Sequence, residues 1–352
     1  MWRHSGIGRY LREVVPGMVA SWPGARWRLL GPGAGEWLVA GAETIAWTTP
    51  IYAVREHTDC APPAWRDADL RWVPHYNVVA GTRAPLLVTI HDLLPLHERD
   101  GWRGALRAAV LRHYLRRVRR VASRVVCPST FSRASVLAAG VAEAERVVVT
   151  PLGVASAFGS ATSRAGRESC WLYVGNVKPH KGLDTLLTAF AALAEECPHR
   201  LVIVGRREGF FTEAPGLEGK VAALQNRVLW AGEVSEADLA LWYARAEALV
   251  LPSRHEGFGL PVLEAMAAGC PVVAARAGAL PETGGDAARF FETGDAAGLA
   301  KVLRELAGDP SERARLSKLG RDRAAGFTWR QTAELTAAAL REVWEEGWVS
   351  KS

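Results

Sequence analysis

Short apolar runs alternate with stretches of helical periodicity along most of the chain. Apolar runs bounded by polar or turn residues are typical of buried strands, and the stretches between them predict helices. The alternation predicts a parallel sheet with crossover helices, which is an α/β architecture. The expected strands lie at residues 27–30, 70–73, 86–90, 124–127, 147–149, 171–174, 201–204, 228–230, 248–251 and 272–275.

Two domains are expected, because 352 residues suffice for two cores of ordinary size. Residues 155–169 are small and polar, which is typical of a linker between domains. Near its C-terminus the chain has an amphipathic helical pattern that begins near Trp329 and runs to Trp344. We therefore expect one domain on each side of the linker, followed by a final helix.

The composition is that of a globular protein, with 49% hydrophobic and 23% charged residues. No run of eighteen apolar residues occurs, and the first residues lack the apolar core of a signal peptide. The cysteines form no Cys-x-x-Cys pair, so neither a disulfide framework nor a structural zinc site is expected. These features predict a cytoplasmic protein. The five cysteines are Cys60, Cys127, Cys170, Cys197 and Cys270.

The positive charge is concentrated in the first half of the chain. Residues 1–165 contain 21 Arg and no Lys against 12 acidic residues, and the whole chain has a net charge of +6. Many of these arginines lie in residues 103–124, where apolar residues recur at helical spacing. This basic amphipathic helix has two interpretations: contact with an anionic membrane, or a surface helix whose apolar face lies in the core. Nucleic-acid binding is not expected, because no zinc finger, recognition helix or aromatic-basic interleaving accompanies the helix.

Residues 253–271, SRHEGFGLPVLEAMAAGCP, predict a glycine turn and a helix between two strands. Pro261 suits the first turn of a helix, and apolar runs precede and follow the segment. In open α/β sheets such units bind phosphates and nucleotides at the carboxyl ends of strands. Glu256 on the turn and Glu264 on the helix are expected to face one crevice, where carboxylates suit hydroxyl-rich ligands. For Glu264 alone, a glutamate favoured by the helix dipole is the alternative.

Two further motifs lie in the first half of the chain. Ser5-Gly6-Ile7-Gly8 opens a helical pattern, and its glycines would let backbone N–H groups approach an anion. His91 and Asp92 follow an expected strand, so the imidazole is expected to face a ligand crevice. Asp92 either orients His91 or caps a helix. Ser129 and Ser132, which follow the next strand, are expected to be helix caps.

A cationic segment opens the second half of the chain at residues 175–182, Gly-Asn-Val-Lys-Pro-His-Lys-Gly. An expected strand ends at Gly175 and a helix follows, which predicts an anion site at Lys181. Lys178, Arg206 and Arg207 are the candidates for a second cation at this site.

These motifs, in this order, resemble the retaining glycosyltransferases of family 4, also called glycosyl transferases group 1, which have the GT-B fold. The resemblance runs from about Ser5 to about Trp344, and residues 249–285 are its most specific part. It implies two Rossmann-like, doubly wound domains that face a central cleft. The implied bounds are 1–158 for the acceptor side and 159–328 for the nucleotide sugar, with 329–352 crossing back to the first domain.

The family normally has a first β-strand before the glycine loop of the first domain. Only four residues precede Ser5, so the first domain is expected to lack that strand. Many relatives also have an arginine after the glycine that corresponds to Gly175. Here that residue is Asn176, so the second cation must come from elsewhere.

The resemblance implies catalytic roles for Glu256, His91 and Lys181. Glu256 and His91 would contact the donor sugar, Lys181 the diphosphate, and Glu264 the ribose. Neither cofactor nor metal is implied, because Lys181 and helix N-termini can stabilise a diphosphate. The implied donor-binding residues are Gly6, Gly8, Gly175, Lys178, Lys181, Arg206, Glu256, Gly257, Phe258, Gly259, Leu260 and Glu264.

The implied activity is transfer of a hexose, with retention, from a nucleotide diphosphate sugar to a hydroxyl of a glycan or lipid-linked acceptor. The motifs look most like those of bacterial mannosyltransferases of polysaccharide assembly. GDP-mannose is therefore the first choice of donor, with a UDP-hexose or a dTDP-deoxysugar as alternatives. The alternative classes are a GT-B epimerase or phosphorylase, and a non-catalytic carbohydrate- or membrane-binding relative. A peripheral contact through residues 103–124 would place the protein at the inner face of the cell membrane.

Overall fold

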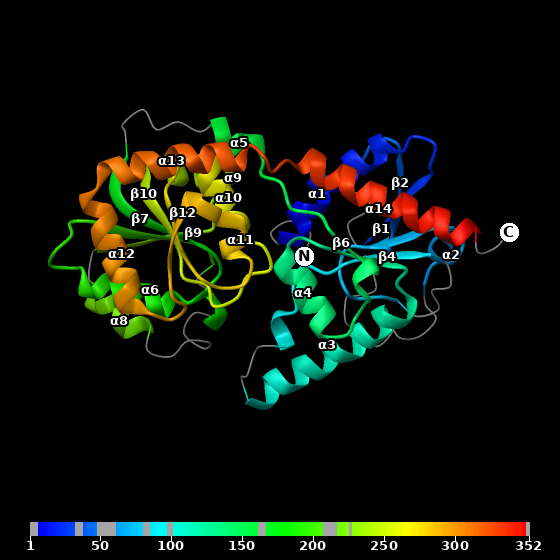
Figure 1. Cartoon of the computed structure of the whole chain (residues 1–352), viewed down its shortest axis with the longest axis horizontal. Helices are drawn as coiled ribbons and strands as arrows, with labels where there is room; N and C mark the ends of the chain where they lie inside the picture. Colours follow the sequence, from blue (N-terminus) through cyan, green and yellow to red (C-terminus); the bar gives the residue numbers. More distant parts are fainter. Residues whose placement is uncertain are drawn as a thin grey trace. The chain divides into compact units, whose positions relative to one another are not determined.

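The structure, a computed structural model, describes residues 6–31, 38–47, 61–79, 85–96, 101–160, 167–206, 217–224 and 227–349. The chain forms two compact units. The first unit comprises Met1–Gly153 with Trp329–Ser352, and the second unit comprises Val154–Thr328. Both consist of parallel strands and helices (Figure 1). The α/β architecture predicted from the alternating pattern is therefore confirmed.

The second unit contains a six-stranded parallel sheet in the order β12-β11-β10-β7-β8-β9. Counted from the first strand of the unit, this is the doubly wound order of Rossmann folds. The winding reverses between β7 and β10, and ligands of such sheets bind beyond the carboxyl ends of the strands at that point. The strands are β7 (Glu168–Val174), β8 (Arg200–Val204), β9 (Val228–Gly232), β10 (Ala246–Leu251), β11 (Val272–Ala275) and β12 (Ala288–Phe291).

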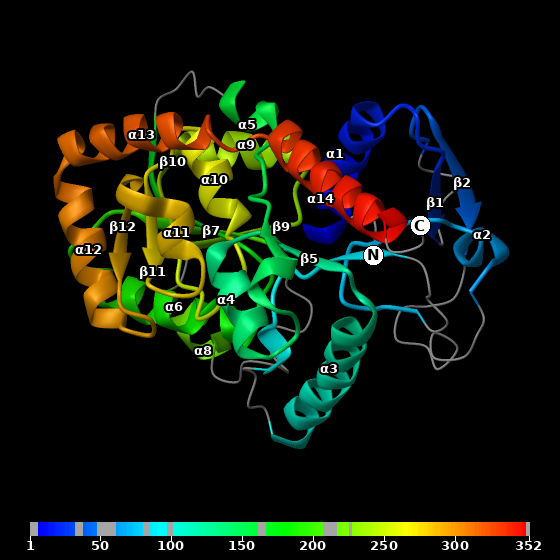
Figure 2. The same ribbon diagram turned by 45° about the vertical axis from the view of Figure 1, so that its right-hand side comes forward.

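Helices cover both faces of this sheet (Figures 1 and 2). On one face, α6 and α12 pack together over a core that includes Trp171, Ile203 and Val250. On the other face, α10 packs against α5, α9 and α13. The helices are α5 (Ser156–Ser160), α6 (Leu183–Ala192), α8 (Leu217–Ala223), α9 (Glu236–Arg245), α10 (Leu260–Ala267), α11 (Leu280–Gly284), α12 (Ala296–Gly308) and α13 (Pro310–Ala324).

The segment 155–169, expected to be a linker, is partly helical. Its residues Ser156–Ser160 form α5, and its residues 161–166 lie outside the described part of the chain. Phe158 is fully buried, with its ring centroid 5.8 Å from that of Tyr243. The linker prediction was wrong here because one buried aromatic ring fixes a segment whose other residues are small and polar.

The first unit has a four-stranded parallel sheet, β3-β4-β5-β6, and a separate parallel pair, β1-β2. The ten strands predicted from apolar runs are all present in the two units, whereas β2 and β12 were not predicted. The expected absence of a first strand concerns residues before Gly6, which lie outside the described part. The strands are β1 (Trp27–Gly31), β2 (Ala42–Ala46), β3 (Arg71–Val73), β4 (Leu86–Thr89), β5 (Arg124–Cys127) and β6 (Val147–Val149).

The final helix lies beside the first one in the first unit (Figures 1 and 2). The approach is close, because a Cβ added to Gly17 of α1 would lie 2.7 Å from the Cβ of Ala333 on α14. None of the described helices combines the length and apolar composition needed to cross a bilayer. The helices of this unit are α1 (Gly6–Ser21), α2 (Pro63–Arg66), α3 (Gly101–Val121), α4 (Thr130–Ala138) and α14 (Trp329–Val349).

The basic helix, α3, spans Gly101–Val121 and not residues 103–124, and it is only partly buried. Arg124 belongs to β5 and forms ion pairs with Glu342 and Glu346 of α14. The apolar residues Tyr114, Leu115 and Val118 lie in the core, but Trp102, Leu106 and Val110 are 73%, 57% and 41% exposed. Of the two interpretations of this helix, the one that places its apolar face in the core holds for the second half of α3 but not for the first half.

Candidate functional site

Loops from both sides of the reversal point in the second unit's sheet meet at its carboxyl edge. β7 and β10 are hydrogen-bonded neighbours, and the loops that follow them carry Lys181 and Glu256. Gly182 permits the approach, since it has φ of 67° and a Cβ there would lie 2.0 Å from the carbonyl oxygen of Pro252. A side chain at this position would push the two loops apart.

Lys181 and Glu256 form an ion pair between these loops. Nζ of Lys181 donates to Oε1 of Glu256 at 2.7 Å, and the two side chains are 22% and 12% exposed. The buried Ser253 donates its hydroxyl to the same Oε1 atom, also at 2.7 Å. Within the described residues no donor contacts Oε2, so this second oxygen is available to a ligand.

A third loop, which follows β11, fixes the backbone of Glu256. The N–H of Ala279 donates to the carbonyl oxygen of Glu256 at 2.9 Å. Gly278 has φ of 56°, and a Cβ on it would lie 2.3 Å from that same carbonyl oxygen. Glu256 is thus held from three strand ends, which favours a pre-organised carboxylate over a solvated one.

Glu264 lies in α10 and is 4% exposed. Tyr243 of α9 donates its hydroxyl to Oε2 of Glu264 at 2.9 Å. Tyr243 is itself fully buried and packs edge-on against Phe158. A buried carboxylate with a dedicated donor does not fit the simpler interpretation of a solvated glutamate placed by the helix dipole.

The remaining residues of the glutamate motif shape the turn. Gly259 precedes α10 in the left-handed region, with φ of 95°, and Leu260 begins the helix. Phe258 is buried, packs edge-on against Phe327, and accepts a hydrogen bond at its carbonyl from the Thr283 hydroxyl at 2.5 Å. Gly257 lies between Glu256 and Phe258 in this turn. Phe258 therefore anchors the turn to the core.

The candidates for a second cation differ in their surroundings. Lys178 is exposed, and within the described part of the chain its ammonium makes no hydrogen bond or ion pair, whereas its backbone N–H donates to the carbonyl oxygen of Asn176 at 3.1 Å. Arg206 follows β8 and pairs with Glu233, which follows β9, at 2.5 Å. Both members of that pair are about half exposed, so the pair itself is weak. Arg207 lies outside the described residues, as does Ser5.

In the first unit, α1 and the end of β4 come together. Gly6 begins α1, Gly8 is buried, and Tyr10 places its ring edge-on to His91 with centroids 4.9 Å apart. Nε2 of His91 lies 3.2 Å from the carbonyl oxygen of Pro74. Burial, and then the neighbouring His75, lowers the pKa of His91 to about 4, so its imidazole is neutral at pH 7.

The polar residues around His91 have structural roles. Asp92 accepts the N–H of Leu94 at 3.0 Å, so it caps a short 3-10 turn. Ser129 accepts the N–H of Ser132 at the start of α4, as a cap does. The hydroxyl of Ser132 donates to the carbonyl oxygen of His91 at 2.9 Å. Of the two interpretations of Asp92, the structure favours the cap.

Two residues of the second-unit site were missed in the sequence. Ser253 precedes Glu256 by three residues and contacts its carboxylate, and this short spacing could have indicated the contact. Tyr243 is 21 residues from Glu264 and carried no signal beyond its place in a helical pattern.

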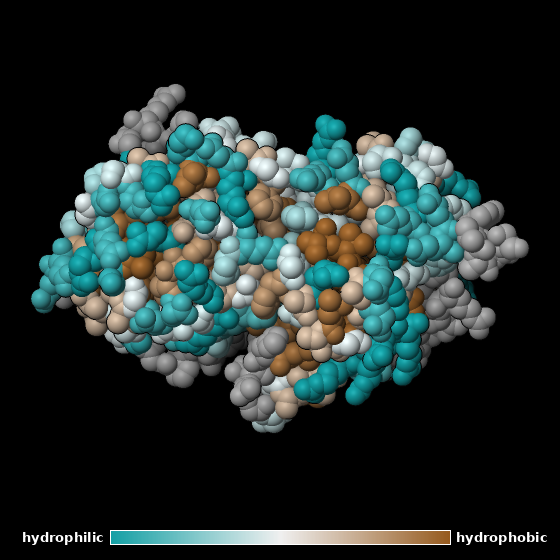
Figure 3. Space-filling model, viewed as in Figure 1, coloured by the Kyte–Doolittle hydropathy of each residue, from teal (hydrophilic) through white to brown (hydrophobic). Residues whose placement is uncertain are grey.

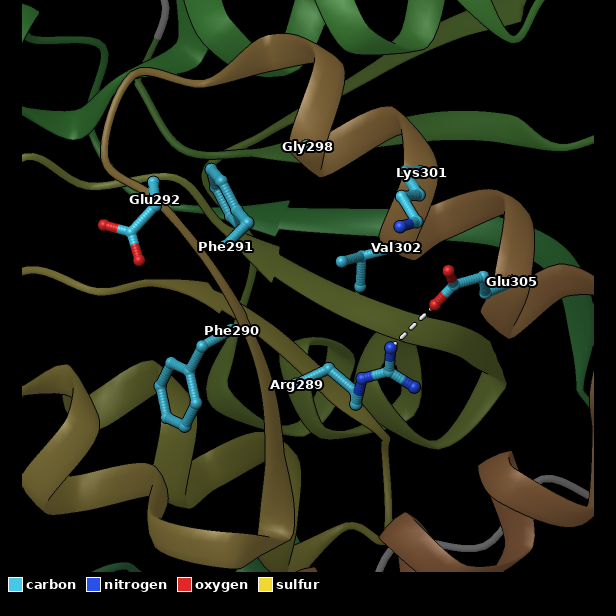
Figure 4. A pocket seen from close by; sticks show the side chains of 8 residues that line it. All are labelled: Arg289, Phe290, Phe291, Glu292, Gly298, Lys301, Val302 and Glu305. Carbon is cyan, nitrogen blue, oxygen red and sulfur yellow. Dashed lines mark hydrogen bonds and ion pairs between the residues drawn. The ribbon is translucent and has the colours of Figure 1, made fainter.

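A separate hollow of about 240 Å³ lies at the β12 edge of the same sheet, between β12 and α12 (Figure 4). Arg289 lies in its wall and pairs with Glu305 at 2.7 Å. None of the candidate site residues lines this hollow. Among the described residues, no group of three or more His, Cys, Asp or Glu side chains is placed to hold a metal.

Two family profiles match the chain in sequence order. The profile described as Glycosyltransferase Family 4 matches residues 57–158, and the profile described as Glycosyl transferases group 1 matches residues 168–309. The second match covers Lys181, Glu256 and Glu264.

Curated relatives match over part of their length. A D-inositol 3-phosphate glycosyltransferase of Kineococcus radiotolerans is 34% identical over 62% of this chain and 57% of its own length. The O-antigen chain mannosyltransferase B of Escherichia coli is 31% identical over 41% of each chain. The chain therefore spans about half of the length of the curated relatives that it matches.

The solved structures include a neighbour that covers nearly the whole chain. Anabaena Alr3699/HepE in complex with UDP-glucose has a TM-score of 0.78 at 22% identity, and the match covers 97% of each chain. This likeness shows the two-domain GT-B fold, which agrees with the doubly wound sheet of the second unit. Taken with the two family matches, it shows a chain that carries a Glycosyltransferase Family 4 region followed by a Glycosyl transferases group 1 region on the GT-B fold.

Proposed function

We propose that the chain transfers a sugar from a nucleoside diphosphate sugar to a hydroxyl of a glycan or lipid-linked acceptor. The observation that carries this proposal is the contact between Lys181 and Glu256 at the reversal point of the second unit's sheet. It joins a cation that can neutralise a diphosphate to a carboxylate that can bind sugar hydroxyls. A nucleotide sugar presents a diphosphate and sugar hydroxyls side by side, so it can bind both side chains.

Lys181 would stabilise the leaving diphosphate. Its ammonium has three donors, of which one is engaged by Glu256, so the others remain for phosphate oxygens. Charge builds up on the phosphate oxygen as its bond to the anomeric carbon breaks. A cation fixed beside that oxygen stabilises the transition state more than the ground state. Lys178, Arg206 and the first N–H groups of α10 are the candidates for the remaining charge.

Glu256 would orient the transferred sugar through Oε2 while Ser253 and Lys181 hold Oε1. We assign no enzymic nucleophile. In a front-face mechanism the acceptor oxygen bonds to the anomeric carbon on the face that the phosphate leaves, and the departing phosphate oxygen takes the acceptor proton. In these steps the proton passes from the acceptor hydroxyl to the phosphate, and the configuration at the anomeric carbon is retained. The mechanism also needs no divalent cation, so activity should persist with a chelator present.

Glu264 and His91 would contact hydroxyls at two further places. Glu264, whose Oε2 accepts a hydrogen bond from Tyr243, would contact the ribose hydroxyls. His91 is neutral and can accept a hydrogen bond from a sugar hydroxyl, but it cannot supply positive charge.

GDP-mannose is our first choice of donor, and a UDP-hexose is the main alternative. One relative is named as a mannosyltransferase, which supports the first, whereas a structural neighbour was solved with UDP-glucose, which supports the second. Melting temperatures measured with GDP, UDP and dTDP would decide between them, since a ligand that binds only the native state raises the melting temperature.

Peripheral membrane contact through α3 is the second part of the proposal. Its outward face is apolar at the start, with Trp102, Leu106 and Val110 exposed, and basic further along, with Arg116 and Arg120 exposed. Figure 3 shows the same change, with hydrophilic side chains over the C-terminal half of α3, on the right. Exposed apolar side chains could enter the surface of an anionic bilayer while the neighbouring arginines contact its headgroups.

Release of free nucleotide tests the proposed activity. The protein is incubated with each nucleotide sugar, with and without a glycan acceptor, and both nucleotide and sugar product are measured. Acceptor-dependent release supports a glycosyltransferase. Conversion of the nucleotide sugar without release would indicate an epimerase, release that depends on phosphate a phosphorylase, and binding without turnover a non-catalytic relative.

A further inference from the structure

Arg254 lies in the loop after β10, two positions before Glu256, and has no role in the proposed transfer. It faces the short 3-10 turn Pro179–Lys181, which follows β7. Since β7 and β10 are hydrogen-bonded neighbours, the two loops begin side by side. Arg254 is therefore placed to act on Lys181 from the neighbouring loop.

Arg254 contacts this segment before and after Lys181. Its N–H donates to the carbonyl oxygen of His180 at 2.7 Å, and its Nη1 donates to that of Pro179 at 3.4 Å. Its Nη2 pairs with Oδ2 of Asp184 at 2.5 Å. A guanidinium can serve two acceptors at once because its donors form a rigid fork, which a lysine ammonium lacks. One residue thus ties down the positions that flank Lys181.

Lys181 needs this support if a diphosphate binds. Its ammonium donates to Glu256 at 2.7 Å, and a phosphate oxygen would compete with that carboxylate for the same donors. A turn held only through the ammonium would shift whenever this partner changed. The contacts of Arg254 involve backbone atoms of the turn and the carboxylate of Asp184, so they persist when the ammonium changes partner.

The carboxylate of Asp184 is the second reason for an arginine at this position. Asp184 lies in the first turn of α6, three positions after Lys181. Unpaired, its negative charge would repel a diphosphate at Lys181 and offset part of the attraction of the ammonium. The side chains of Arg254 and Asp184 are 43% and 42% exposed, so their pair adds little to the stability of the fold. Its effect should appear in anion binding instead.

We infer that Arg254 is a positioning residue for Lys181, which fixes the turn that carries the ammonium and neutralises Asp184 beside it. Arg254 acts on the diphosphate through Lys181 and not by direct contact. The inference rests on the proposed function, because the diphosphate of a nucleotide sugar is the ligand that Lys181 would bind. It adds to the site a residue that the sequence motifs had not indicated.

Titration calorimetry of the full chain tests this role. Arg254→Met removes both side-chain contacts but keeps a side chain of similar length and the backbone bond to His180. Affinity for GDP, UDP or dTDP, whichever binds the wild-type protein most tightly, should fall about fivefold, which is the upper range for breaking an exposed ion pair. Affinity for the matching nucleoside should not change. The melting temperature reports whether the variant folds.

A double-mutant cycle separates positioning from direct contact. In a Lys181→Ala background, Arg254→Met should have almost no further effect, because the ammonium that it positions is absent. A loss of the same size in this background would mean that Arg254 binds the phosphate itself or acts on the whole fold, and either result would overturn the inference. Arg254→Met combined with Asp184→Asn should recover part of the loss, since no unpaired carboxylate remains.

Arg304→Met is the matched control. Arg304 pairs with Glu196, which lies beyond the opposite end of α6, and the two side chains are 48% and 50% exposed. This variant breaks an equally exposed ion pair and should leave affinity for the diphosphate unchanged. A loss as large as that in Arg254→Met would show a general effect of broken surface pairs and would contradict a specific role for Arg254.

Nuclear magnetic resonance of protein labelled with ¹³C-lysine reports on Lys181 without any nucleotide. The Lys181 signal is identified by its loss in Lys181→Ala. It should move in Arg254→Met, while the signal of Lys318, which is 78% exposed, stays in place. An unmoved Lys181 signal, or unaltered diphosphate affinity in folded Arg254→Met, would overturn the inference. A chain that binds none of the three nucleotides would lose the proposed function, and the Lys181 signal would then decide the inference alone.

Discussion

The hydroxyl of Tyr243 donates a hydrogen bond to Oε2 of Glu264 at 2.9 Å, and both side chains are buried. The two residues come from neighbouring helices, α9 and α10, on one face of the second unit's sheet. The bond leaves Glu264 with one oxygen in a fixed position. If the Glu264 carboxylate binds ribose, Tyr243 is a positioning residue for the nucleotide.

Tyr243→Phe should therefore weaken nucleotide binding through the ribose. Losing the hydroxyl removes a hydrogen bond to a buried carboxylate, and a hydrogen bond to a charged group contributes about 1.5–3 kcal/mol. We expect the affinity for a nucleoside diphosphate to fall several-fold and that for its 2′,3′-dideoxy analogue to change little. Calorimetric titration of both ligands measures this difference. An equal fall for the two ligands would mean that Tyr243 acts only on the fold.

Glu256→Gln should slow turnover by about a hundredfold or more while nucleotide binding persists. The amide keeps the shape of the side chain but loses the charge that pairs with Lys181 and binds sugar hydroxyls. Initial rates and nucleotide affinity are measured on the same preparation. Wild-type turnover in this variant would remove Glu256 from the site.

Lys181→Ala should reduce the affinity for a nucleoside diphosphate about tenfold or more, because a hydrogen bond from a charged group contributes about 1.5–3 kcal/mol. Binding of the nucleoside without phosphates should hardly change. Lys318→Ala is the matched control, since Lys318 lies in α13, is 78% exposed and is not one of the candidate donor-binding residues. If both nucleoside and diphosphate lose affinity equally, the phosphate assignment is incorrect.

Gly278→Ala should impair activity through the backbone of Glu256. A left-handed backbone costs a non-glycine residue about 1–2 kcal/mol, and the added Cβ would collide with the carbonyl oxygen of Glu256. Gly219→Ala in α8 is the control, because nothing lies within 4 Å of its Cβ. Alanine should raise helix stability there by about 0.5–1 kcal/mol. Activity and melting temperature of the two variants are compared, and a fully active Gly278→Ala would contradict this account of how Glu256 is held.

The sequence predicted elements whose signal is local. The apolar runs predicted ten strands, and residues 253–271 predicted the strand, turn and helix around Glu256. β2 (Ala42–Ala46) and β12 (Ala288–Phe291) were missed because each mixes charged or polar residues with apolar ones. Whether a residue such as Leu106 is buried depends on what packs against its helix, which periodicity alone does not show.

The contacts that define the candidate site could not be predicted, because they join distant residues. Lys181 and Glu256 are 75 positions apart, and only the order of strands β7 and β10 makes them neighbours. The motifs indicated that both residues belong to a ligand site. The ion pair, the second bond from Ser253 and the support of Glu264 by Tyr243 follow from the fold.

The exposed face of α3 gives the last prediction. If this face contacts an anionic bilayer, the protein should bind vesicles that contain acidic lipid, and binding should weaken as salt increases. Each arginine near such a surface contributes about 1 kcal/mol. Replacing Arg112, Arg116 and Arg119 with Gln should therefore abolish most of the binding and its dependence on salt.

The apolar end of α3 should contribute differently from the basic end. Replacing Trp102, Leu106 and Val110 with Ser removes exposed apolar side chains, so binding should weaken at all salt concentrations because apolar insertion is not screened. Co-sedimentation with acidic and with neutral vesicles measures the electrostatic and the apolar contributions to binding. Donor hydrolysis should be unchanged in either variant, since the candidate donor residues Lys181 and Glu256 lie in the second unit. Wild-type protein that ignores acidic vesicles at low salt would show that α3 is an ordinary surface helix, and a soluble acceptor would then be the better hypothesis.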